Sequence, residues 1–129
     1  MPAIIATNPK ALYRFLILWF PVVLCMGTIF YFSSLPANDI PPIFPYDDIV
    51  FHFSIYSILG FSFSRAIKET KACLPYAKII VLACFLGLLY GISDELHQAL
   101  APGRNVSGFD VLMDCTGSFF GSVFYVWLK

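Results

Sequence analysis

The stretch Tyr90-Gly-Ile-Ser-Asp-Glu-Leu-His-Gln-Ala-Leu-Ala-Pro-Gly-Arg104 decides the fold, because in it a long apolar run ends in two carboxylates, an imidazole, an amide and a guanidinium. A helix turns by about 100° per residue, so Glu95 and His97 flank a narrow stripe formed by four residues: Gly87, Gly91, Asp94 and Gln98. The glycines of this stripe allow a neighbouring helix to approach closely, and its polar residues face that neighbour. We therefore expect a second helix to pack against this face.

The composition predicts a membrane protein. Of the 129 residues, 59% are hydrophobic, 18% are aromatic and only 12% are charged. A soluble domain of this size cannot bury so much apolar surface, because a large part of a short chain stays in contact with solvent. Lipid is therefore the expected solvent. The formal net charge is zero and no basic block occurs, so we expect no nucleic-acid partner.

Four apolar segments have the length of membrane spans, at residues 12–32, 49–67, 77–98 and 108–128. The first has 21 residues, which extend to about 31 Å in a helix and match the hydrocarbon core of a bilayer. A cleaved signal peptide is the rival interpretation, but Phe32-Ser-Ser-Leu lacks a small-x-small cleavage site. Pro21 lies in mid-span and predicts a kink. We predict an all-α, four-helix transmembrane bundle that forms a single domain over residues 1–129.

The distribution of basic residues predicts the orientation of the bundle. Prolines 36, 41, 42 and 45 make residues 33–48 a loop, and Pro102-Gly103 predicts a turn between the last two spans. Seven of the eight Lys and Arg residues fall on the other side of the predicted spans, at Lys10, Arg14, Arg65, Lys68, Lys71, Lys78 and Lys129. The positive-inside rule makes that side cytoplasmic, so we expect both termini in the cytoplasm.

Polar residues also recur at helical spacing within the second and fourth spans. Asp48, His52 and Tyr56 are four residues apart and therefore share one face. In the fourth span a single side carries two carboxylates followed by two glycines, at Asp110, Asp114, Gly117 and Gly121. Polar groups are costly in hydrocarbon, so we expect both faces to point at protein. The glycines predict tight helix packing.

Acid–base chemistry is the first function that these residues suggest. Asp94 and His97 are three residues apart on one helix, as are Glu95 and Gln98, so both pairs could form without tertiary contacts. A carboxylate that orients a histidine is the minimal unit of general acid–base catalysis. The candidate catalytic residues are therefore Asp94, Glu95 and His97.

The remaining polar residues are candidates for ligand binding, and each also has a purely structural interpretation. The set comprises Asp48, His52, Tyr56, Gln98, Arg104, Asp110 and Asp114. Arg104 could bind a phosphate or carboxylate through its guanidinium group, or it could pair with Asp94 or Asp110. His52 could instead be a satisfied histidine bonded to Asp48 or Tyr56.

A metal site is not assigned from the sequence. The two histidines and several acids could hold a divalent cation, but Asp-Glu-x-His lacks the paired histidines of a helical zinc site. We therefore name no metal ligand, and the sequence indicates neither a cofactor nor an oligomeric state.

Five motifs together resemble the VanZ-like family, which takes its name from a teicoplanin-resistance protein. They cover residues from about 15 to 125 and are Phe32-Ser-Ser-Leu-Pro36, Asp48-x-x-x-His52-x-x-x-Tyr56-x-x-x-Gly60, Tyr90-Gly-Ile-Ser-Asp-Glu-Leu-His-Gln98, Pro102-Gly-Arg104 and Asp110-x-x-x-Asp114-x-x-Gly117. Two positions depart from the family pattern, with Ile49 in place of an expected lysine and Asp114 in place of an expected asparagine. Both changes make the outer end of the bundle more acidic.

The resemblance implies a small multi-pass protein of the bacterial cytoplasmic membrane, linked in part of the family to glycopeptide tolerance. Three function classes follow. The protein could be an enzyme that acts on a lipid-linked envelope precursor, or it could bind a lipid, glycan or glycopeptide antibiotic without turnover. A transporter is the third class, although four short spans leave little room for an alternating-access cycle. Between enzyme and binding protein the sequence does not decide.

Overall fold

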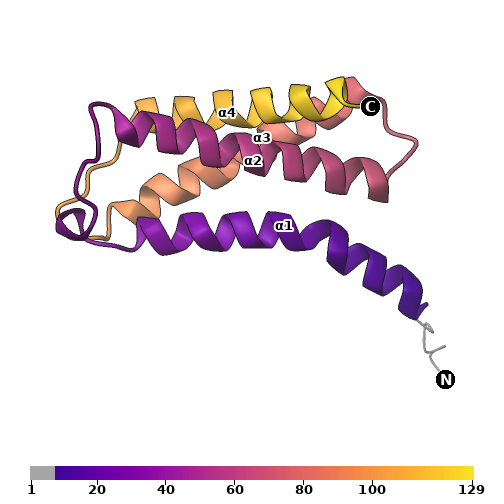
Figure 1. Cartoon of the computed structure of the whole chain (residues 1–129), viewed down its shortest axis with the longest axis horizontal. Helices are drawn as coiled ribbons and strands as arrows, with labels where there is room; N and C mark the ends of the chain where they lie inside the picture. The colour runs from indigo at the N-terminus through magenta and orange to yellow at the C-terminus, as the bar shows by residue number, and fades with distance from the viewer. Residues whose placement is uncertain (1–7) are drawn as a thin grey trace.

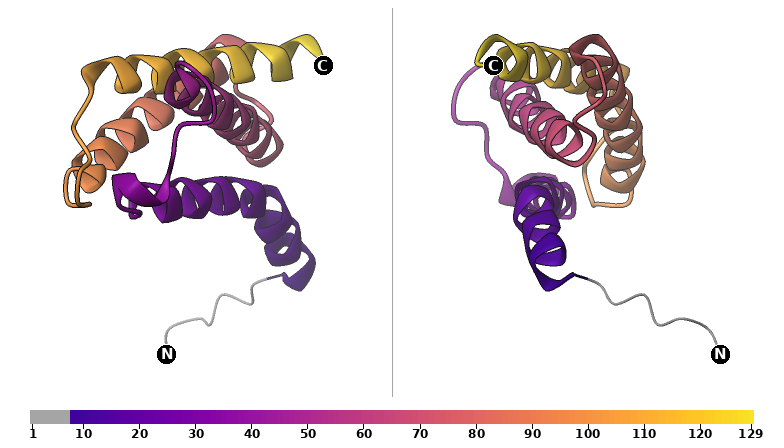
Figure 2. Two further views of the ribbon diagram at one scale, coloured as in Figure 1. Left: turned by 60° about the vertical axis from the view of Figure 1, so that its left-hand side comes forward. Right: turned by 90° about the vertical axis from the view of Figure 1, so that its right-hand side faces the viewer.

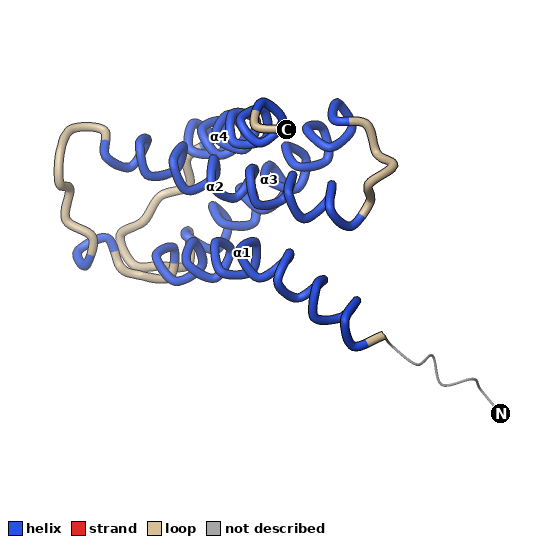
Figure 3. The backbone as a smooth tube through the Cα atoms, turned by 45° about the vertical axis from the view of Figure 1, so that its right-hand side comes forward, coloured by secondary structure: helices blue, strands red, loops and turns tan. Residues whose placement is uncertain are grey.

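The computed structural model describes residues 8–129, so the first seven residues of the predicted domain, including the N-terminus itself, lie outside the described residues. The described chain is all-helical, as Figures 1 and 3 show. Its elements are α1 (Pro9–Ser33), the short 3-10 helix η1 (Ala37–Asp39), α2 (Asp47–Thr70), α3 (Tyr76–Gln98) and α4 (Gly108–Trp127). The predicted all-α architecture with four long helices is thereby confirmed.

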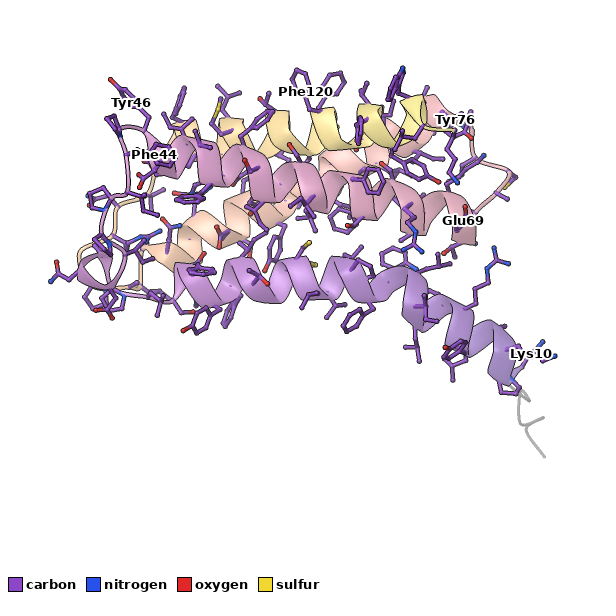
Figure 4. All side chains as sticks on the ribbon, viewed as in Figure 1. Lys10, Phe44, Tyr46, Glu69, Tyr76 and Phe120 are labelled. Atoms are coloured by element: carbon purple, nitrogen blue, oxygen red, sulfur yellow. The ribbon has the colours of Figure 1, made fainter. Side chains whose placement is uncertain are left out.

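Three of these helices, α1, α2 and α3, are long and apolar enough to cross a membrane. α4 does not join them because its 20 residues include two carboxylates and several small polar side chains. Large apolar side chains are nevertheless exposed on its outer side, where Phe120 is 55% exposed and points away from the bundle in Figure 4. Exposed apolar faces of this extent require lipid around them, so the bundle belongs in a bilayer.

Local sequence signals set the ends and the shape of the helices. Asn8 begins α1 by accepting a hydrogen bond from the Lys10 backbone N–H, and Pro9 occupies the first helical position. Ser107 begins α4 by accepting from the Asp110 backbone N–H. Pro21 lies inside α1 and cannot donate to the carbonyl one turn earlier. α1 bends in its N-terminal half, as Figure 1 shows.

Glycines bring α2 and α4 into backbone contact along their length. A Cβ atom added to Gly117 or Gly121 would overlap a backbone carbonyl of α2, and one added to Gly60 would overlap the backbone of Ser118 in α4. Gly87 and Gly91 of α3 make similar room for the side chains of Ser118 and Asp114. Close backbone approach through small residues is a typical way for helices to associate in lipid. The glycine stripes therefore fix how α2, α3 and α4 fit together.

The apolar core lies where α1, α2 and α3 meet, toward the middle of the bundle. Tyr56, Leu59, Ile79 and Ala83 are fully buried there. The other buried members of this core are Val22, Cys25, Ile29, Phe63, Ala66 and Ile67. α1 packs against α2 and, less extensively, against α3, and the two views in Figure 2 show it set apart from α4.

The two ends of the bundle differ in chemistry. At one end the α1–α2 and α3–α4 connections meet, where the Ala37 backbone N–H donates to the Pro102 carbonyl at 3.0 Å. Gly103 turns the chain at this end with a φ of 75°, a conformation that glycine adopts without strain. At the opposite end Glu69 pairs with Arg14 at 3.2 Å and with Lys129 at 3.6 Å. Figure 4 shows Lys10, Glu69 and Tyr76 at that end, opposite Phe44 and Tyr46.

Candidate functional site

The polar residues of α2, α3 and α4 gather at the end where the α1–α2 and α3–α4 connections meet. We call Asp94, Glu95, His52, Asp110 and Asp114 the polar cluster. Asp94, Glu95 and Asp114 are buried, whereas His52 and Asp110 are half-buried. The helical spacing of each segment predicts which residues share a face, and the packing of three helices brings those faces together.

The closest pair in the polar cluster joins α2 to α4. His52 Nδ1 lies 2.8 Å from Asp114 Oδ1, and the side chains of these residues are 12% and 0% exposed. Of the alternatives that the sequence left open for His52, neither Asp48 nor Tyr56 is its hydrogen-bond partner. Its ring stacks parallel to that of Tyr56, with the centroids 6.5 Å apart. The imidazole is thus held by a carboxylate from another helix.

The hydrogen bond between Asp94 and His97 that the helical spacing allowed is not formed. Each of these residues instead has a partner at the C-terminal end of α1. The Ser33 hydroxyl donates to Asp94 Oδ1, and His97 Nε2 lies 2.9 Å from the Ser34 hydroxyl. The His97 ring also stacks on Phe30, with the centroids 4.3 Å apart. α1 packs against this face of α3, and its terminal serines satisfy groups that would otherwise have paired within the helix.

The predicted Glu95–Gln98 pair is not formed either. Glu95 Oε2 accepts a hydrogen bond from the Ser107 backbone N–H at 2.7 Å, so it holds the connection that leads into α4. Gln98 is buried in the last turn of α3. The backbone N–H of Ser107 lies at the start of a helix, where it has no acceptor within that helix. Glu95 therefore accepts from this N–H and not from the Gln98 side chain one turn away.

Two of the proposed ligand-binding residues lie outside the polar cluster. Asp48 is exposed in the first turn of α2, where the helix dipole favours a carboxylate. Arg104 is half-buried in the α3–α4 connection and forms no ion pair with Asp94 or Asp110 in the described part of the chain. Its guanidinium therefore stays available at this end of the bundle.

Two tyrosines, Tyr56 and Tyr90, lie next to the polar cluster on the side toward the middle of the bundle. Tyr56 is fully buried, and its ring centroid lies 6.4 Å from that of Tyr90. The Tyr90 hydroxyl donates to the Met26 carbonyl of α1 at 2.6 Å. Tyr56 belongs to the apolar core and Tyr90 packs against it, so the polar cluster adjoins the core at these two tyrosines.

Several buried polar atoms around the site have no hydrogen-bond partner within residues 8–129. They include Glu95 Oε1, Asp114 Oδ2 and the Tyr56 hydroxyl. Unpaired buried carboxylate oxygens are uncommon, because burial without a partner costs free energy. The arrangement can therefore accept further hydrogen bonds or a positive charge.

His52, Glu95 and Asp110 have the geometry of a possible metal site. One donor atom from each lies within 4.8 Å of the others. The sequence allowed histidines and acids to hold a divalent cation but did not single out this set, because its members come from three helices and have no local spacing in common.

The surface hollows of the molecule lie elsewhere. One runs along α1, where Phe20 and Tyr31 are among the residues that line it, and another lies between α2 and α4 beside Phe53 and Phe120. Both are apolar and sit on faces that lipid would cover. The polar cluster borders neither of these two hollows.

Three serines with a part in the site were missed as site residues from the sequence: Ser33, Ser34 and Ser107. Ser33 and Ser34 belong to the Phe32-Ser-Ser-Leu-Pro36 motif, which pointed to the family but not to a partner on α3. Ser107 could have been found as a helix cap, since it precedes Asp110 by three residues at the start of an apolar segment.

Comparison with protein families gives a match to the VanZ/LLP1 family model over residues 18–129, which is nearly the whole chain. Comparisons with curated proteins and with solved structures gave no match. The matched range includes all residues of the polar cluster, the three serines that contact it and the glycines that pack α2 against α4. On the extent of this match, the chain belongs to the VanZ/LLP1 family.

Proposed function

We propose that the polar cluster binds the polar part of a lipid-linked or cell-wall-related ligand at the outer side of the bacterial cytoplasmic membrane. The observation that carries this proposal is the His52–Asp114 pair, 2.8 Å apart and enclosed by helices of a membrane bundle. Ionisable residues at membrane depth are costly and by default mark a functional site. Glu95, with a buried oxygen that lacks a partner, adds acceptor capacity beside the pair.

His52 and Asp114 also form the acid–base unit that the geometry favours. A carboxylate bonded to one ring nitrogen holds the imidazole in place, and the other nitrogen is then free to give or take a proton. Asp94 and His97 are less suited to this role because α1 serines already contact both. Binding comes first in the proposal, and proton transfer to a bound ligand is the chemistry that this unit supports.

Arg104 is the proposed anchor for an anionic group of the ligand. It lies in the connection next to the polar cluster and is free of ion pairs among the described residues. A guanidinium group matches the oxygens of a phosphate or carboxylate, which are common in lipid-linked envelope precursors. Teicoplanin tolerance, implied by the family name, is one phenotype in which such binding would be visible.

Mass spectrometry of the intact protein in mild detergent tests this binding. We expect the wild-type protein to retain a lipid-linked anion, and the Arg104→Gln variant to lose it. Lys78→Gln is the matched control, because it removes the same charge from an exposed residue at the other end of the bundle. Equal retention by both variants, or a wild-type protein that retains nothing but detergent, would contradict the proposal.

The orientation of the bundle is the second part of the proposal. α1 begins at the same end as the α2–α3 connection, and α4 ends there, as Figure 1 shows. The basic residues Lys10, Arg14, Lys71 and Lys129 belong to that end, which the positive-inside rule makes cytoplasmic. The α1–α2 connection and the polar cluster then face outward.

Thiol labelling of intact cells measures this orientation directly. Cys73 is exposed in the α2–α3 connection, and Asn38 is exposed in the α1–α2 connection. With the other three cysteines replaced, we expect an impermeant thiol reagent to label an Asn38→Cys, Cys73→Ser protein in intact cells. In the second protein, which keeps Asn38 and has Cys73 as its one cysteine, we expect Cys73 to react only after the membrane is permeabilised. The reverse pattern would place the polar cluster on the cytoplasmic side.

A further inference from the structure

Three donor residues from three different helices converge within the polar cluster. His52 of α2, Glu95 of α3 and Asp110 of α4 each offer one atom, and these atoms lie within 4.8 Å of one another. Two donors bound to one small divalent ion at about 2.0–2.2 Å are roughly 3–4 Å apart. The described set therefore needs a closure of about 1–2 Å to meet that geometry.

Asp114 contacts the His52 imidazole in the way that a carboxylate commonly contacts a metal-bound histidine. Its Oδ1 lies 2.8 Å from His52 Nδ1, so we assign Nε2 as the nitrogen that would bind a metal ion. In metal sites the second ring nitrogen of a ligating histidine regularly donates to a carboxylate, which fixes the tautomer and the ring orientation. Asp114 is fully buried, so this contact is built into the bundle.

Glu95 is the second, independent observation, because one of its oxygens is buried without a partner. Its side chain is 1% exposed; Oε2 accepts from Ser107, whereas Oε1 has no hydrogen bond within residues 8–129. Asp114 Oδ2 is in the same state. The ion pairs that lysine and arginine make in this part of the chain all involve Glu69 at the other end of the bundle. A cation would supply the charge that these carboxylates lack.

Ser107 links the Glu95 carboxylate to the backbone that carries Asp110. Its backbone N–H donates to Glu95 Oε2 at 2.7 Å, and its hydroxyl accepts from the Asp110 backbone N–H at 3.2 Å. One residue thus connects the end of α3 to the first turn of α4. A donor held by a second layer of hydrogen bonds, as Glu95 is, binds metal more tightly than a free side chain does.

We propose that His52, Glu95 and Asp110 bind one divalent transition-metal ion, with Asp114 as the residue that positions the imidazole. One imidazole and two carboxylates form a donor set suited to Zn²⁺ or Mn²⁺. Three protein ligands leave a coordination position open for water or for an oxygen of an anionic ligand. This goes beyond the proposed function, since the bundle can bind an anionic lipid through Arg104 without any metal. An ion on His52 Nε2 would take the place of the proton-transfer role proposed for that nitrogen.

Titration of the full-length protein in detergent with Mn²⁺ tests the proposal, after removal of metal with EDTA. Binding is followed by the loss of the electron paramagnetic resonance signal of free Mn²⁺, and Zn²⁺ is then added as a competitor. Mn²⁺ is chosen because thiols are poor ligands for it, so the exposed Cys73 does not contribute. We expect one ion per chain, displaced by Zn²⁺.

Two conservative variants separate metal binding from structure. Glu95→Gln keeps a carbonyl oxygen that can accept from Ser107 but loses the negative charge, and Asp110→Asn changes a half-buried side chain that makes no side-chain hydrogen bond among the described residues. We expect each to weaken Mn²⁺ binding by about tenfold or more. Asp39→Asn is the control, because it removes an exposed carboxylate at the same end of the bundle and should leave the affinity unchanged.

Two results would overturn the proposal: a wild-type protein that binds neither ion with the expected stoichiometry, or variants that bind as well as the wild type. Thermal unfolding without metal shows whether Glu95→Gln is folded, and if it is not, Asp110→Asn decides. Failure here is separate from failure of the proposed function, because lipid retention is measured on the same protein after EDTA treatment. Retained lipid without metal binding would overturn only the metal site.

Discussion

Replacement of Gly121 by alanine is expected to destabilise the bundle by about 3 kcal/mol, the upper part of the range for overpacking. A Cβ atom at this position would overlap the Ser57 carbonyl oxygen of α2. The obstacle is backbone, which cannot rotate away as a side chain can, so α2 and α4 must separate. Separation also removes the contacts on either side, at Gly117 and Gly60.

Gly27 provides a matched control for this experiment. It is also a glycine inside a helix, but an added Cβ atom would meet nothing within 4 Å. Gly27→Ala should therefore change stability by less than about 1 kcal/mol, and in the stabilising direction, because alanine favours helix more than glycine does. Both variants are compared by thermal unfolding in detergent. Equal stability of the two would show that α2 and α4 are not in backbone contact.

His52→Ala is expected to have the second large effect, lowering the free energy of unfolding by about 3 kcal/mol. The substitution removes the hydrogen-bond partner of Asp114 and leaves a fully buried carboxylate without one. Asp114→Asn alone should cost much less, about 1 kcal/mol, because the amide oxygen can still accept from His52 Nδ1. In the double variant the neutral amide should restore much of the stability that His52→Ala loses.

The double-mutant cycle measures this coupling, with His97→Ala as a second histidine for comparison. His97 contacts a serine hydroxyl and the Phe30 ring rather than a carboxylate. The loss of stability caused by His97→Ala should therefore be smaller than that caused by His52→Ala, and Asp114→Asn should not relieve it. Additive effects of His52→Ala and Asp114→Asn would show that the two side chains do not interact.

Function and stability should separate at Asp114. Groups that are kept for binding or chemistry can be neutralised with little loss of stability while activity disappears. We expect Asp114→Asn to keep its expression level and yet to lose the envelope phenotype of the wild type. If stability and phenotype fell together, the polar cluster would be a packing element.

The sequence predicted the helices well because their signals are local. Apolar length, the prolines of residues 33–48 and the turn at Pro102-Gly103 place the ends of the helices within a few residues of those in the structure. The stripe formed by Gly117 and Gly121 follows from helical spacing alone. None of these features depends on knowing which helices are neighbours.

The partners within the site could not be predicted in the same way. His52 and Asp114 are 62 residues apart, and Ser33 and Asp94 are 61 apart. Which residues meet depends on the depth and rotation at which the helices pack, and these follow from contacts such as that of Gly121 with Ser57. Reasoning within one helix paired Asp94 with His97, because it could not include α1 as a competitor.

The close contact between α2 and α4 also has a consequence for biogenesis. α4 follows α1, α2 and α3 in the sequence, and it carries two carboxyl groups in its first two turns. Such a segment partitions poorly into hydrocarbon by itself. During synthesis the earlier helices emerge first, and the glycine-lined surface of α2 and α3 is then ready to receive it. We therefore expect insertion of α4 to depend on the surface that α2 and α3 form before it, and a chain truncated ahead of α4 would leave that surface exposed to lipid.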